Sequence, residues 1–109
     1  MNKELMETSD ILLRSGKKAI ILDTKYKDIG QTIPPAEHVR QVFCYSRISN
    51  AKKCILIYAS NKEIPTKQYN LPDNVCLFRS HFNMKGSSKE DFDINCSKFI
   101  DEINNIISI

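Results

Sequence analysis

The sequence predicts an α/β fold: a small mixed sheet that begins with a β-hairpin, followed by a crossover helix and a C-terminal helix. Two unbroken apolar runs, 19–22 and 54–59, have the length and isoleucine content of strands buried on both faces. A segment of helical periodicity lies between them. A strand, a helix and a second strand in this order predict parallel strands joined by a right-handed crossover.

The initial hairpin is predicted from the segment before the first apolar run. Residues 10–14 have the pattern of a short strand, and Gly16 lies in a tight turn that favours a residue able to adopt a positive φ. The chain then returns antiparallel through residues 19–25. Counting outward from the turn puts Asp10 within one position of Asp23, so the two carboxylates are expected close together.

The crossover helix is expected from about residue 36 to residue 50. The apolar positions of its core-facing stripe are Val39, Val42 and Phe43. Gln41 and Tyr45 are four residues apart and share a different face, which is expected to look toward the same cavity as Lys25.

The last part of the chain is predicted as a loop, a strand and a helix. Residues 60–73 carry two prolines and are interpreted as a polar loop, and residues 74–79 as a further strand at the sheet edge. Ser87 and Glu90 have the spacing of a capping box at the start of a helix. The stripe expected to pack on the sheet consists of Phe92, Cys96, Phe99, Ile100, Ile103 and Ile107.

Composition favours a single domain over residues 1–109, with residues 1–8 as a loose arm. The net charge of +3 comes with basic residues crowded near the hairpin, which favours an anionic partner. The four cysteines lack zinc-ligand spacing, so no zinc site or disulfide is expected. Without a signal peptide or a membrane-length apolar run, the expected location is the cytoplasm, with no membrane partner.

The first apolar run ends in Asp23, Thr24 and Lys25. Side chains alternate along a strand, so Asp23 and Lys25 emerge on one face. A carboxylate can hold a hard cation such as Mg²⁺, and a neighbouring ammonium can offset charge on a phosphoryl oxygen. A strand end that simply reaches solvent is the alternative interpretation of these three residues.

The pattern Asp-x12-Asp-x-Lys, followed by Gln-x3-Tyr on a helix, resembles the PD-(D/E)xK nuclease superfamily. Within it, the chain is most similar to the nuclease subunit of modified-cytosine-dependent restriction systems, the McrC-like proteins. The segments that carry the resemblance are 9–13, 21–27, 41–45 and 55–58. The resemblance implies a restriction-endonuclease-like core, truncated at its N-terminus because too few residues precede Asp10 for the first helix and strand of the family.

The resemblance also implies a function, that of a Mg²⁺-dependent DNA endonuclease working with a nucleotide-hydrolysing restriction partner subunit. The residues it assigns to catalysis are Asp10, Asp23, Lys25, Gln41 and Tyr45. Asp10, Asp23 and the backbone carbonyl of Thr24 would bind Mg²⁺. Lys25 would position or activate the attacking water, and the pair on the helix would orient the site or contact the DNA backbone.

Several expectations accompany this interpretation. Ser9 stands where the family motif has proline, a change that leaves the metal ligand intact. His38 is expected on the helix surface and His81 in a loop or at a sheet edge. The bare edge of the first strand predicts a homo-oligomer or a bound partner. The alternative functions are a non-catalytic nuclease-like module for DNA binding or complex assembly, and a plain α/β structural protein.

Overall fold

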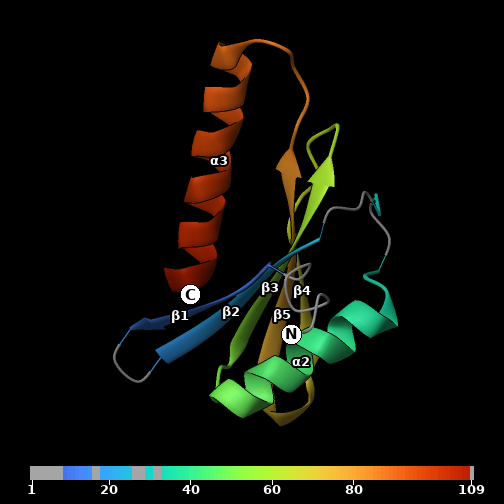
Figure 1. The fold of residues 1–109 in the computed structure, drawn as a ribbon, viewed down its shortest axis with the longest axis vertical. Helices are drawn as coiled ribbons and strands as arrows, with labels where there is room; N and C mark the ends of the chain where they lie inside the picture. Colours follow the sequence, from blue (N-terminus) through green and yellow to red (C-terminus); the bar gives the residue numbers. More distant parts are fainter. Residues whose placement is uncertain (1–8, 16–17, 26–28, 31–32, 109) are drawn as a thin grey trace, which may run out of the picture.

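The computed structural model describes residues 9–15, 18–25, 29–30 and 33–108, with the backbone alone at residues 9, 10, 14 and 15. Within these residues, five strands form one mixed sheet in the order β1-β2-β3-β5-β4. The strands are β1 (Ser9–Ser15), β2 (Lys18–Lys25), β3 (Lys53–Ser60), β4 (Lys67–Leu71) and β5 (Val75–Asn83). Two helices, α2 (Ala36–Ser49) and α3 (Lys89–Ser108), lie on opposite sides of the sheet (Figure 1).

The hairpin and the crossover unit are confirmed. β1 pairs antiparallel with β2, and the register puts Asp10 directly opposite Asp23. β2 pairs in parallel with β3, and α2 connects them. The helix ends at Ser49 because Asn50 adopts the left-handed conformation (φ 56°, ψ 36°), which asparagine tolerates better than most residues.

Both faces of the central strands are covered, as the unbroken apolar runs predict. The core on the α2 side contains Ala19, Ile21, Val42, Ala51, Cys54, Leu56, Tyr58, Val75 and Leu77. The core on the α3 side contains Ile20, Leu22, Ile55, Ile57, Phe78 and Ile106. Alternate residues of β2 and β3 therefore contribute to different cores, which is the expected consequence of the two-residue period of a strand.

Two predictions for the second half of the sheet are wrong. The segment 60–73 is not only a loop, because it contains β4 and the start of the 3-10 helix η1 (Pro72–Asn74). β4 is an edge strand in which only alternate residues are even half-buried, so its apolar signal is confined to Tyr69 and Leu71. β5 is an interior strand between β3 and β4, not an edge.

The predictions for α3 are partly wrong. The backbone N–H of Asp91 donates to Ser88 Oγ at 3.0 Å, so the capping residue is Ser88, one position after the predicted Ser87. Phe92 and Ile100 are more than half exposed, whereas Ile106 is buried and was not expected in the stripe. The packing face is thus rotated toward Phe99, Ile103, Ile106 and Ile107, the residues that pack on the core.

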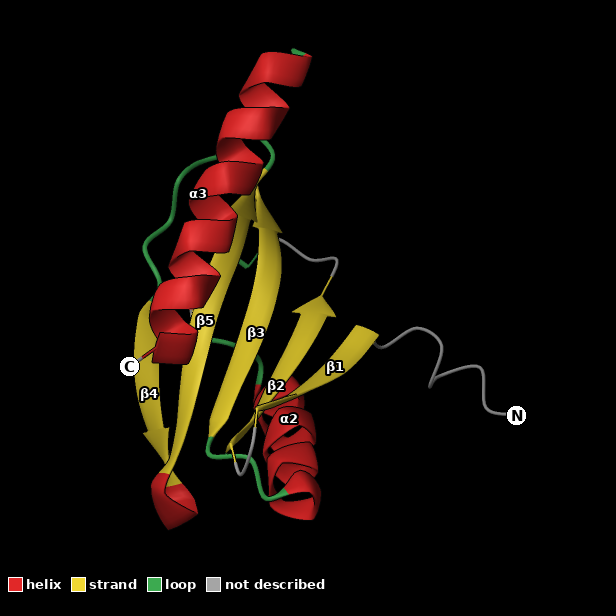
Figure 2. Ribbon diagram, turned by 90° about the vertical axis from the view of Figure 1, so that its left-hand side faces the viewer, coloured by secondary structure: helices red, strands yellow, loops and turns green. Residues whose placement is uncertain are grey.

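Figure 2 shows α3 lying across the face of the sheet opposite α2, with β1 at the far edge of the sheet from β4. α3 packs mainly on β5, and α2 packs on β2 and β3. Neither of these described helices combines the length and the apolar character needed to span a membrane.

Candidate active site at the end of strand β2

Asp23 is a buried carboxylate in the middle layer of the molecule. It follows Ala19 and Ile21 on the face of β2 that looks toward α2, and it has no exposed surface. Its neighbours in the sheet register are Asp10 on β1 and Leu56 on β3. The predicted proximity of positions 10 and 23 is therefore confirmed for the backbone, while the Asp10 carboxylate lies outside the described atoms.

Lys25 is held between the strand and the crossover helix. Its ammonium Nζ lies 2.9 Å from Asp23 Oδ2 and donates a hydrogen bond of 2.9 Å to Gln41 Oε1. The Lys25 side chain is only 13% exposed, so both contacts lie in a region of low dielectric where charges interact more strongly than in water. The sequence therefore correctly places Asp23, Lys25 and Gln41 around one point.

The phase of α2 explains how Gln41 reaches the strand. Val42 is fully buried, and Val39 and Phe43 pack on the same core, as predicted. Gln41 lies at the border of this apolar face and is half-buried, so its amide can contact Lys25. Tyr45 is also half-buried and packs against the apolar core on the α2 side.

A buried tyrosine lies beside this group on the next strand. Tyr58 of β3 is paired in register with Lys25 and is 1% exposed. Burial, and then the negative charge of Asp23, raise the pKa of the Tyr58 hydroxyl far above its usual range. Tyr58 therefore stays neutral at physiological pH. Its hydroxyl makes a hydrogen bond of 2.9 Å with Nδ1 of His38, so His38 is not the free surface residue that was expected.

The row of polar residues continues onto β5. Arg79 is the register neighbour of Leu56, and His81 is the register neighbour of Tyr58. Both are buried, and the rings of Tyr58 and His81 lie 5.8 Å apart. Arg79 also donates a hydrogen bond of 3.1 Å to the carbonyl oxygen of Pro65. The expectation that His81 lies in a loop is wrong, because His81 belongs to β5 and pairs with Tyr58 of β3. On its other side the pairing of β5 with β4 ends at Arg79, so His81 has a strand neighbour on one side among the described residues.

We use the name polar row for this set of side chains on the α2 side of the sheet. It consists of Asp23, Lys25, His38, Gln41, Tyr58, Arg79 and His81. The row lies toward the carboxyl ends of the three parallel strands β2, β3 and β5. In open α/β sheets, this is the end at which ligands bind.

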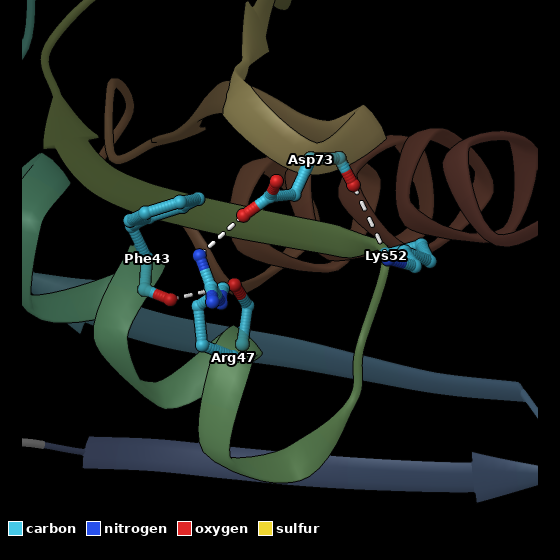
Figure 3. A network of polar contacts seen from close by, with 5 residues as sticks. Phe43, Arg47, Lys52 and Asp73 are labelled. Atoms are coloured by element: carbon cyan, nitrogen blue, oxygen red, sulfur yellow. Dashed lines mark hydrogen bonds and ion pairs between the residues drawn. The ribbon is translucent and has the colours of Figure 1, made fainter.

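Other basic residues of the α2 region have structural contacts. Arg47 pairs with the carboxylate of Asp73, and Lys52 donates a hydrogen bond of 3.2 Å to the Asp73 carbonyl oxygen (Figure 3). These contacts connect the end of α2 to η1. Lys53 donates to the last carbonyl oxygens of α3, at 2.9 Å to that of Ile106. Such contacts stabilise the C-terminal ends of helices, where the last carbonyl groups lack intrahelical hydrogen-bond partners.

A hard cation such as Mg²⁺ binds oxygen ligands, and Asp23 is the described carboxylate nearest to Lys25. Among the described residues, neither carboxylate oxygen of Asp23 accepts an aligned hydrogen bond; the 2.9 Å contact with Lys25 is an ion pair without hydrogen-bond geometry. A carboxylate oxygen that accepts no aligned hydrogen bond has lone pairs left for a hard cation such as Mg²⁺. Within the described side chains, no group of three or more His, Cys, Asp or Glu residues is arranged to hold a metal. Asp23 therefore fits the ion, and the second carboxylate would have to be that of Asp10.

Comparison of the chain with protein-family models, with curated proteins and with solved structures finds no match. The resemblance to a nuclease family therefore rests on the motif residues of the sequence.

Sequence reasoning missed the contributions of Tyr58, Arg79 and His81. A usable signal was present: in β5 the core residues Val75 and Leu77 are followed at the same two-residue spacing by Arg79 and His81. Polar residues that continue a buried face of a strand indicate a polar site in the core. That signal depended on recognising β5 as an interior strand.

Proposed function

We propose that the chain is a Mg²⁺-dependent DNA endonuclease module of restriction type, with a nuclease-like core. The observation that carries the proposal is the position of Lys25 Nζ, 2.9 Å from both Asp23 Oδ2 and Gln41 Oε1. Three residues selected by a motif spacing thus meet at one buried point, although 16 positions separate Lys25 from Gln41.

The chemistry assigned to each residue follows from its surroundings. A bound Mg²⁺ would supply Lewis acidity and lower the pKa of a water for attack on phosphorus. Asp23 and Asp10, with the carbonyl of Thr24, would hold the ion. Lys25 would offset negative charge on the phosphoryl oxygens, and the hydrogen bond that its ammonium donates to Gln41 Oε1 would fix the direction of that ammonium.

Two further residues would shape the proposed site. Tyr45 packs on the core beneath α2 and would hold the helix that carries Gln41 in position. The neutral hydroxyl of Tyr58, held by His38, would add a polar but uncharged wall beside Lys25. The proposed partners are DNA and a nucleotide-hydrolysing restriction subunit, because the similarity is to the McrC-like proteins.

The test is nicking of supercoiled plasmid with Mg²⁺ and with excess chelator, in the presence of any required partner subunit. Wild type should nick only with Mg²⁺. Asp23→Asn should abolish Mg²⁺-dependent nicking, because the amide keeps the shape of the side chain but carries no charge for the ion. Gln41→Ala should retain activity at a reduced level, because the charge of Lys25 remains but its orientation is lost. Lys25→Ala should lower the rate by about 10²–10³, the usual cost of one electrostatic contact to the transition state.

Lys18→Ala is the matched control, because Lys18 lies at the exposed start of the same strand and carries the same charge. It should nick at the wild-type rate. Circular dichroism at the assay temperature establishes that each variant is folded before its rate is compared. Equal nicking by wild type and a folded Asp23→Asn variant would reject the nuclease proposal.

The alternative is a non-catalytic nuclease-like module for DNA binding or complex assembly. The observation in its favour is the ion pair itself, because Lys25 balances the charge of Asp23 within the protein and the pair can stabilise the fold without a metal. This alternative predicts DNA binding that is unaffected by Mg²⁺ and by Asp23→Asn, and no nicking by wild type under any condition.

A further inference from the structure

β1 leaves apolar surface uncovered on both faces of the sheet. Ile11 is 49% exposed, and Leu12 and Leu13 are each 41% exposed. Ile11 and Leu13 pair in register with Leu22 and Ile20, which belong to the core on the α3 side, whereas Leu12 pairs with Ile21 on the α2 side. The helices pack on β2, β3 and β5, so β1 lies beyond their cover.

The outer edge of β1 is also open among the described strands, because β2 is its pairing partner and β1 is the first strand in the sheet order. A strand edge that is apolar on both faces is a template for pairing with another strand. A partner strand at this edge would extend the sheet, and the subunit that carries it would cover apolar side chains on both faces of β1.

The sequence of β1 is complementary to itself when reversed. It reads Ser-Asp-Ile-Leu-Leu-Arg-Ser, and Leu12 is its central residue. In an antiparallel pair of two such strands centred on Leu12, each Asp10 lies opposite Arg14 of the second copy. Ile11 then lies opposite Leu13, and serine lies opposite serine at the ends. Opposite charges and apolar residues directly across from each other stabilise antiparallel strands.

We propose that β1 pairs antiparallel with β1 of a second copy of this chain, with the two-fold axis at Leu12, so that two sheets join into one. A shift of the register by two residues in either direction would put Asp10 or Arg14 opposite Leu12. The charges therefore select the centred register. An isologous interface of this kind closes after two subunits and leaves no further strand edge at that side.

The dimer has a consequence for the polar row. Position 10 pairs with Asp23 on one side, and in the dimer it pairs with Arg14 of the second copy on the other. Each subunit would thus add position 14, an arginine, to the row of register positions 10 and 23 of the other subunit, where its charge would favour a phosphate. The dimer itself follows from the sheet edge alone. Only this added role for Arg14 rests on the proposed nuclease function.

The first test is a charge exchange measured by sedimentation equilibrium, without DNA or metal, so that its result is independent of nicking activity. Wild type should dimerise. Asp10→Arg and Arg14→Asp should each weaken the dimer by about tenfold or more, because every opposite-charge pair becomes a like-charge pair. The double variant with both exchanges should regain wild-type affinity. A monomeric wild type would overturn the dimer, and a double variant no tighter than the single ones would overturn the register.

The second test uses cysteines in a Cys44→Ser background, because Cys44 is exposed in the wild type. Leu12→Cys places two thiols directly opposite each other, where Cα atoms about 4.5–5.5 Å apart are within reach of a disulfide. It should form a covalent dimer on mild oxidation. Ile11→Cys is the matched control, since its thiol lies opposite Leu13 of the second copy and should remain largely uncrosslinked. Equal crosslinking of the two variants would contradict the pairing.

Discussion

At the scale of single residues, the central feature is the ion pair between the half-buried Lys25 and the fully buried Asp23. From the sequence, a lysine at a strand end is expected to contribute little to the core, so that Lys25→Ala would leave the fold nearly intact. That expectation does not fit a side chain only 13% exposed and paired with a fully buried carboxylate. Removing one partner of a buried ion pair leaves the other charge without compensation, and that is more costly than removing both.

This asymmetry gives a prediction for stability. Lys25→Met should lower the free energy of unfolding by about 3 kcal/mol, because Asp23 is left buried and unpaired. Adding Asp23→Asn should recover most of the loss, since the uncompensated charge is gone. Urea denaturation of wild type, both single variants and the double variant measures the cycle. Additive effects of the two substitutions would show that the 2.9 Å contact contributes no coupling.

At the scale of elements, the sequence predicted a helix or strand correctly wherever the apolar residues of that element are the ones buried in the core. β2 and β3 could be predicted because both of their faces are apolar. α2 could be predicted because its apolar residues lie on a single face of the helix. The meeting of Lys25 with Gln41 could also be predicted, because strand alternation and helical spacing fix both directions.

The remaining elements lacked such a signal. β4 is an edge strand with one weakly apolar face, so its composition resembles a loop. The face of β5 that looks toward α2 changes from apolar residues to Arg79 and His81. The second half of this strand therefore cannot be predicted from its hydrophobicity. The phase of α3 was misjudged because Phe92 and Ile100 are apolar but exposed. An apolar stripe on a helix does not specify which of its residues the sheet covers.

The start of α3 offers a test with a built-in control. Ser88 accepts the backbone N–H of Asp91 at 3.0 Å and precedes the first helical residue, Lys89. Ser88→Ala should therefore lower the free energy of unfolding by about 1 kcal/mol, the usual contribution of an N-cap hydroxyl. Ser87→Ala, one position earlier, should have little effect. Thermal unfolding of the two variants measures both losses. A larger loss of stability for Ser87→Ala would show that Ser87 is the capping residue, as predicted from the sequence.

At the scale of the whole molecule, coverage of the sheet is uneven. β3 lies between two parallel neighbours and contributes to both cores, and β5 is paired on both sides beneath α3. The two outer strands differ from each other. β4 has no fully buried residue and a mostly polar surface, whereas β1 presents three large apolar side chains to solvent. The fold is therefore most complete at its centre and least complete at the β1 edge, next to the polar row.

This unevenness predicts a pattern of amide hydrogen exchange that depends on protein concentration at one edge only. The central strands β3 and β5 should exchange slowest at every concentration, because their opening requires loss of the core. Amides on the outer edge of β1 should exchange fast in dilute solution and become protected as concentration rises, since pairing with a second copy supplies their acceptors. β4 is the internal control: it is the other edge of the same sheet, and its exchange should not change with concentration. Exchange of β1 that is as independent of concentration as that of β4 would mean that the apolar edge stays unpaired, and the joined sheet would have to be abandoned.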